Sequence, residues 1–186
     1  MKKVSGKILE LFGWKLTGEY PDVKQSVIVF APHTSNWDYV IGKLFFHEKE
    51  IETKILMKKE LFVFPLNLFF DAVGGIPVDR KHKSNMVKEV VGLFKENEQF
   101  NLVISAEGTR NKTSNWKKGF YHIANQADVP IIISYINYKN KTVGLDGLML
   151  KHENLDMAMS ELSNYYKNIP GKYENKFALN QSTINN

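Results

Sequence analysis

His33 and Asp38 are the pair of side chains whose types and spacing best fit acid–base chemistry. An imidazole can take a proton from a hydroxyl while a carboxylate holds its other ring nitrogen. Residues five apart do not share a face of a continuous helix, but a strand-to-helix turn between them would bring the two side chains together. Two structural interpretations remain open. Ser35-x-x-Asp38 also fits a helix capping box, and His33 can be an isolated turn histidine.

A second group of residues fits anion binding. Glu107-Gly108-Thr109-Arg110 follows the apolar run 102–104, and Arg80 follows a Gly-Gly turn. Glycine lets backbone approach a ligand closely, and arginine presents a planar fork suited to phosphate. Both arginines begin basic runs without an acidic residue, 80–88 and 110–118. A phosphate site is therefore favoured over a solvated basic face. Glu107 has an alternative role as the ion-pair partner of either arginine.

These residues need a scaffold of strands and helices to position them. Apolar runs and periodicity predict strands and helices in alternation. The predicted strands are 26–31, 54–57, 75–79, 102–104 and 129–138. The predicted helices are 35–48, 60–73 (with a break near Pro65) and 118–127. Two more helices are predicted to begin at the caps Ser84 and Asn154. This order predicts an α/β fold, a single domain with a mostly parallel central sheet flanked by helices. Ligands of such sheets gather at the carboxyl ends of the strands, where His33 and Glu107 stand.

Composition sets outer limits on the function. The chain has 186 residues, 43% hydrophobic and 24% charged, a formal net charge of +5 and no cysteine. It therefore has no disulfide scaffold, thiolate zinc site or cysteine nucleophile. The basic residues match no nucleic-acid recognition motif, so we expect no nucleic-acid partner. His33, Asp38 and Glu107 are metal-ligating types, but nothing in their spacing demands a metal, and we expect none.

Two apolar segments bear on membrane contact. Val4, Ile8, Leu11 and Phe12 form one face of a short N-terminal amphipathic helix, which either docks on the core or lies at a lipid interface beside Trp14. Residues 61–70 are apolar all round a helix and either join the core or contact lipid or an acyl chain. No apolar run is long enough to span a bilayer. We divide the chain into an amphipathic segment (1–20), the α/β domain (21–169) and a polar, frayed tail (170–186).

Taken together, four blocks in order resemble those of the glycerolipid acyltransferases, the lysophosphatidic acid acyltransferase (1-acylglycerol-3-phosphate acyltransferase) family. The blocks cover roughly residues 25–138 and are His33-x4-Asp38, Gly75-Ile76-Pro77-Val78-Asp79-Arg80, Glu107-Gly108-Thr109-Arg110 and Val129-Pro130-Ile131-Ile132. A lone H-x4-D pattern is weak, but with E-G-T-R downstream and a basic block between them the resemblance is specific.

The resemblance implies acyl transfer from an acyl thioester, on acyl carrier protein or coenzyme A, to the hydroxyl of a lysophospholipid. His33 would be the general base and Asp38 would orient it. Arg80 would bind the phosphate of the acceptor, and Glu107, Gly108, Thr109 and Arg110 would complete that site. No metal or cofactor is implied, because the thioester already carries a good leaving group. With no membrane span, a peripheral position on the cytoplasmic face of the cell membrane is expected.

Several residues depart from the family pattern at the borders of this site. Pro32 stands where the family often has Asn, Ser105-Ala106 replaces Phe-Pro, Ile133 replaces a proline, and Trp37 is unusual beside Asp38. None removes a reactive group. They leave the acceptor open between 1-acylglycerol-3-phosphate and another lysolipid such as a lyso-aminolipid. A non-catalytic module that binds anionic lipid is the alternative from another class.

Overall fold

The structure is a computed structural model that describes residues 4–79, 83–150 and 154–181. Seven strands form one sheet in the order β1-β7-β6-β2-β5-β3-β4. The strands are β1 (Lys15–Thr17), β2 (Gln25–Ala31), β3 (Lys54–Lys58), β4 (Gly75–Val78), β5 (Phe100–Ser105), β6 (Ile131–Asn137) and β7 (Thr142–Leu150). The helices are α1 (Val4–Leu11), α2 (Trp37–Glu48), α3 (Leu66–Ala72), α4 (Lys83–Glu96), α5 (Gly119–Ala127) and α6 (Leu155–Tyr166), with short 3-10 turns η1 (Lys59–Leu61) and η2 (Glu174–Lys176).

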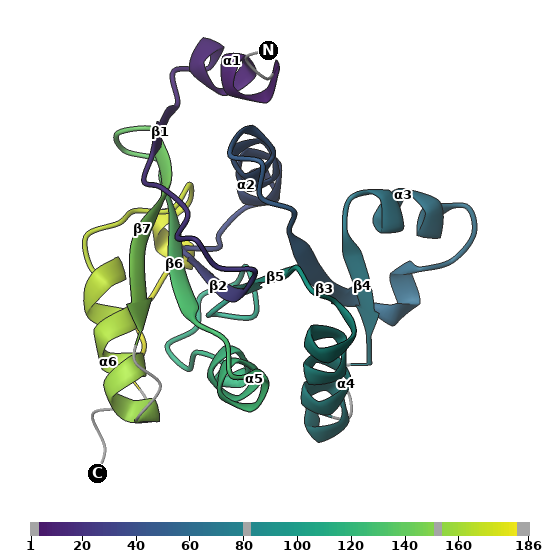
Figure 1. The fold of residues 1–186 in the computed structure, drawn as a ribbon. Helices are drawn as coiled ribbons and strands as arrows, with labels where there is room; N and C mark the ends of the chain where they lie inside the picture. The colour runs from purple at the N-terminus through teal and green to yellow at the C-terminus, as the bar shows by residue number, and fades with distance from the viewer. Residues whose placement is uncertain (1–3, 80–82, 151–153, 182–186) are drawn as a thin grey trace.

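Five adjacent strands, from β6 to β4, run parallel, whereas β7 pairs antiparallel with β6 and parallel with β1. The expected α/β fold with a mostly parallel sheet is thus confirmed. The central strands are continuous apolar runs because helices cover both of their faces. Figure 1 shows α1, α2 and α3 on one side of the sheet and α4 and α5 on the other.

Two clusters of buried side chains fill the two sides of the sheet. The larger joins Val27 and Val29 of β2 to residues of α4, α5 and α6, including Phe94, Phe120 and Met159. The smaller joins Ile28 of β2 to residues of α1 and α2, including Leu9, Ile41 and Phe45. Alternate residues of β2 therefore face opposite layers, as the two-residue repeat of a strand requires.

The N-terminal helix α1 is present, but its apolar stripe is not its buried face. Ser5, Gly6 and Leu9 are buried, whereas Val4, Leu11 and Phe12 are 70%, 82% and 64% exposed. Glu48 at the end of α2 accepts hydrogen bonds from the Gly6 backbone N–H (2.8 Å) and the Ser5 hydroxyl (3.1 Å). A carboxylate on backbone N–H groups is favourable at a helix N-terminus. Polar contacts to α2 therefore determine which side of α1 is buried, and the apolar stripe of Val4, Leu11 and Phe12 points away from the core.

The expected frayed tail is wrong for residues 170–181, which follow the surface of the domain. The buried ring of Trp116 donates through Nε1 to the Ala178 carbonyl oxygen (3.0 Å), and its backbone N–H donates to Asn180 Oδ1 (3.2 Å). Near the start of the segment, a Cβ on Gly171 would lie 2.8 Å from the Thr34 side chain, closer than real Cβ atoms approach. The polar composition of this stretch conceals its role, because backbone and amide groups make many of these contacts.

Candidate active site

The two members of the proposed acid–base pair meet beyond the carboxyl end of β2. His33 lies in the turn after the strand, and Asp38 lies in the first turn of α2. His33 Nδ1 is 3.2 Å from Asp38 Oδ2, and the side chains are 24% and 0% exposed. In the tautomer that carries its proton on Nδ1, His33 donates to Asp38, which leaves Nε2 free to accept a proton. The turn thus brings together side chains that a continuous helix would separate.

Asp38 also organises the turn that carries His33. Its Oδ2 accepts hydrogen bonds from the backbone N–H groups of Thr34 and Ser35, both at 2.8 Å, and the Ser35 hydroxyl accepts from the Trp37 N–H at 3.1 Å. These bonds are those of a capped helix start. The capping and acid–base interpretations of Asp38 are therefore compatible, since one carboxylate makes both sets of contacts.

Glu107 holds the backbone of His33. Its side chain points inward, so that Oε1 accepts the His33 N–H (2.7 Å) and Oε2 accepts the Ser105 hydroxyl (2.9 Å). Burial raises the pKa of the Glu107 carboxyl above its usual value, while hydrogen bonds from His33, from its own backbone N–H and from Ser105 oppose that rise. Because β2 and β5 are neighbours in register, with Phe30 opposite Ser105, the two strand ends deliver His33 and Glu107 to the same place.

The rest of the E-G-T-R block forms the turn after Glu107. Gly108 has a φ of +65° and a Cβ there would lie 2.7 Å from Lys117 Cγ, so this position favours glycine. The Thr109 hydroxyl accepts the Asn111 N–H (3.2 Å), and Arg110 is exposed. Arg80, the other proposed phosphate contact, lies outside the described residues.

Two further contacts at the site involve residues outside the four sequence blocks. The Tyr138 hydroxyl donates to Asp38 Oδ1 at 2.6 Å, and the Tyr173 N–H donates to the Thr34 hydroxyl at 3.3 Å. Tyr138 ends the strand predicted over 129–138, so the same strand-end argument could have found it. For Tyr173 the sequence carries no such signal, because its contact arises from the path of the C-terminal segment.

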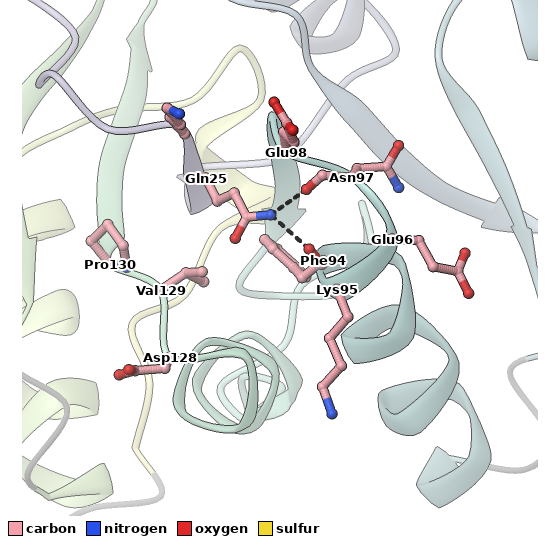
Figure 2. Close-up of a pocket in the computed structure, with 10 residues that line it drawn as sticks. Gln25, Phe94, Lys95, Glu96, Asn97, Glu98, Asp128, Val129 and Pro130 are labelled. Carbon is pink, nitrogen blue, oxygen red and sulfur yellow. Dashed lines mark hydrogen bonds between the residues drawn. The ribbon is translucent and has the colours of Figure 1, made fainter.

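An open depression of about 560 Å³ lies at the other end of the strands, where β2 begins. It is bordered by the first residue of β2, the end of α4 and the turn before β6 (Figure 2). Gln25 donates there to the carbonyl oxygens of Phe94 (2.6 Å) and Asn97 (2.5 Å), so its side chain ties β2 to α4. This depression is thus remote from His33. Within the described ranges, no set of three or more histidine and acidic side chains is arranged to hold a metal ion.

Comparison with known proteins identifies the family and the fold of this chain. A family model described as Acyltransferase matches residues 14–136. A search of curated proteins gives no match. The fold is similar to the crystal structure of the 1-acyl-sn-glycerophosphate (LPA) acyltransferase PlsC from Thermotoga maritima, with a TM-score of 0.60 and 16% identity over 92% of this chain and 79% of that chain. The family model matches residues 14–136, which is more than half of the chain, and on that ground the chain belongs to the Acyltransferase family.

Proposed function

We propose that the protein transfers a fatty acyl group from an acyl thioester, carried by acyl carrier protein or coenzyme A, to the hydroxyl of 1-acylglycerol-3-phosphate. The observation that carries the proposal is the His33–Asp38 pair, whose backbone is held by buried Glu107. The fold shared with the T. maritima LPA acyltransferase supports this acceptor. No metal or cofactor enters the reaction.

In this mechanism His33 Nε2 takes the proton of the acceptor hydroxyl as its oxygen attacks the thioester carbonyl carbon. The tetrahedral intermediate collapses, the C–S bond breaks, and the departing sulfur receives the proton from His33. The products are the acylated lipid and a free thiol. Asp38 keeps the imidazole in the tautomer that accepts at Nε2 and stabilises the imidazolium that forms.

The assay uses purified protein with acyl carrier protein and coenzyme A thioesters and a panel of lysolipids. Equal amounts of thiol released and lipid acylated would support the proposal. Strong preference for a lyso-aminolipid would replace the acceptor and keep the chemistry, whereas thiol release without an acylated lipid would contradict acyl transfer.

Arg110→Ala is expected to raise the KM for 1-acylglycerol-3-phosphate about ten- to a hundredfold, with kcat changed less than about twofold. A hydrogen bond to a charged group contributes roughly 1.5–3 kcal/mol, and Arg110 is exposed on the turn beside Glu107, where a phosphate can reach it. Steady-state kinetics at several acceptor concentrations measure the effect. Lys95→Ala, a cation at the remote depression, is the control. An unchanged KM in Arg110→Ala would remove the phosphate contact from the proposal.

Exposed apolar side chains on one side of the sheet support peripheral membrane binding. Within the described ranges, all large apolar side chains that are strongly exposed belong to residues 4–69, except Met157 and Tyr173. These residues lie on or next to α1, on α2 and on the η1–α3 segment, which share one side of the sheet (Figure 1). The most exposed are Val4, Leu11, Phe12, Phe64, Leu68 and Phe69. No helix of the described residues is long and apolar enough to cross a bilayer. We place this side against the cytoplasmic face of the cell membrane.

The double substitution Leu11→Ser with Phe12→Ser is expected to weaken partition onto anionic phospholipid vesicles about a hundredfold. Removing two inserted side chains costs about 3 kcal/mol at roughly 1.5 kcal/mol each. Sedimentation with vesicles measures binding, and the melting temperature should not change, because both side chains are exposed. Met157→Ser, on α6 and 71% exposed, is the control for a similar loss of apolar surface on the other side. Equal weakening by both variants would refute the assigned side.

A further inference from the structure

Tyr138 stands immediately after β6 and reaches the buried carboxylate of the proposed acid–base pair. The two oxygens of Asp38 have different partners. Oδ2 faces His33 and the N–H groups of Thr34 and Ser35, whereas Oδ1 accepts the Tyr138 hydroxyl at 2.6 Å. The Asp38 side chain is completely buried, so water does not compete for Oδ1. The phenol therefore supplies the hydrogen bond that this oxygen requires.

The surroundings of Tyr138 keep its ring in place. Its backbone N–H donates to the Pro170 carbonyl oxygen at 3.2 Å. Its ring meets the edge of Trp14, with ring centroids 5.1 Å apart and planes at 87°. Segments from both ends of the domain thus fix the tyrosine, and Trp14 is itself only 8% exposed.

The Tyr138 hydroxyl keeps its proton and can therefore donate a hydrogen bond. Burial and the hydrogen bond to Asp38, together with the nearby charge of that carboxylate, raise the pKa of the Tyr138 hydroxyl above its usual value. The phenol therefore remains protonated across the range in which His33 acts as a base, and the hydrogen bond runs from tyrosine to aspartate throughout.

We propose that Tyr138 is a positioning residue for acyl transfer, which holds the Asp38 carboxylate in the rotation that presents Oδ2 to His33 Nδ1. A carboxylate can turn about its last side-chain bond, and its two oxygens are chemically equivalent until their partners distinguish them. Without the phenol, Oδ1 would be buried without a donor, and rotation of the carboxylate that brings Oδ1 toward the N–H groups of Thr34 and Ser35 would relieve part of that cost. Rotation would move Oδ2 away from the imidazole and release His33 to its other tautomer. This inference rests on the proposed role of His33 as the base.

Tyr138→Phe tests the proposal, because phenylalanine keeps the ring contact with Trp14 and the backbone bond to Pro170. We expect kcat to fall about ten- to a hundredfold, the factor typical of one hydrogen bond to a charged group, with both KM values within about twofold. Tyr165→Phe is the matched control. The Tyr165 hydroxyl also bonds a carboxylate, that of Asp146 on β7, so its loss removes the same kind of hydrogen bond away from His33.

The second readout is the tautomer of neutral His33, which a purely structural tyrosine would leave unchanged. Long-range proton–nitrogen correlations through the ring carbons report it, at a pH about two units above the ordinary histidine pKa of about 6.5. We expect the Nδ1–H form in the wild type and in Tyr165→Phe, and a shift toward the Nε2–H form in Tyr138→Phe. Comparison with His33→Ala assigns the signals.

Several results would overturn the proposal. They are a kcat for Tyr138→Phe within twofold of the wild type, equal losses in the two tyrosine variants, and an unchanged tautomer. The failure of the proposed function is distinguishable from these. If the wild type transfers no acyl group, or if His33→Ala retains its turnover, the acyltransferase mechanism fails, while the tautomer comparison still decides whether Tyr138 orients the pair.

Discussion

Replacing His33 with alanine is expected to lower kcat for acyl transfer about a thousandfold and to leave the melting temperature nearly unchanged. A positioned general base contributes roughly 10²- to 10⁴-fold, and His33 is the imidazole that meets a buried carboxylate in this site. The fold should tolerate the change, because Asp38 keeps its bonds from Thr34, Ser35 and Tyr138 when the imidazole is removed. Thiol release from the acyl donor, measured with both the donor and the acceptor at saturating concentrations, gives kcat.

The matched control for this substitution is His122→Ala. His122 is exposed on α5 and its ring contacts Tyr121, so the variant loses an imidazole of the same size away from the site. We expect it to keep wild-type kcat. Turnover in His33→Ala above about a tenth of the wild-type value would show that another group takes the proton, and the proposed mechanism would then be wrong.

The position of the site could be predicted from the sequence because it depends on strand direction alone. Polar blocks follow the apolar runs that form β2 and β5. Because these two strands are parallel neighbours, their carboxyl ends lie at the same edge of the sheet. The inward turn of Glu107 could not be predicted in this way. Its contact with the His33 N–H depends on the register of Phe30 opposite Ser105 and on the path of the following turn. Motif spacing along the chain does not determine either.

The peripheral elements show what periodicity leaves undetermined. The repeat of Val4, Ile8 and Leu11 predicted helix α1 but not its buried side, which Glu48 selects through hydrogen bonds to the opposite face. Strand β7 was not predicted, because its sequence contains Gly144 and Gly147, and glycine is rare in strands. Its pairing with β6 is a tertiary contact. By contrast, the cap of α6 is local, and Asn154 does accept the N–H groups of residues 156 and 157.

Trp116→Ala is expected to have the largest effect on stability, a loss of about 3–5 kcal/mol in the free energy of unfolding. The side chain is 1% exposed and its ring lies 6.0 Å, centroid to centroid, from both Tyr166 and Phe177. The substitution leaves a cavity between α6 and the C-terminal segment and removes the hydrogen bond to Ala178. Urea unfolding, monitored by circular dichroism, measures the change. Trp37→Ala is the control, since Trp37 is 56% exposed, and its loss should cost less than about 1 kcal/mol.

The same substitution should lower activity at temperatures where the protein remains folded, because the C-terminal segment supports the turn that carries His33. Gly171 packs against Thr34 and Pro32, and the Tyr173 N–H bonds the Thr34 hydroxyl. Pro170 also accepts the Tyr138 N–H. Loosening the C-terminal segment at Trp116 therefore removes restraint from Thr34 and Tyr138, which both donate hydrogen bonds to Asp38. We expect kcat to fall severalfold at 25 °C in Trp116→Ala, in a range where circular dichroism shows the variant fully folded. Wild-type kcat in a folded but destabilised variant would show that the segment stabilises the domain without shaping the site.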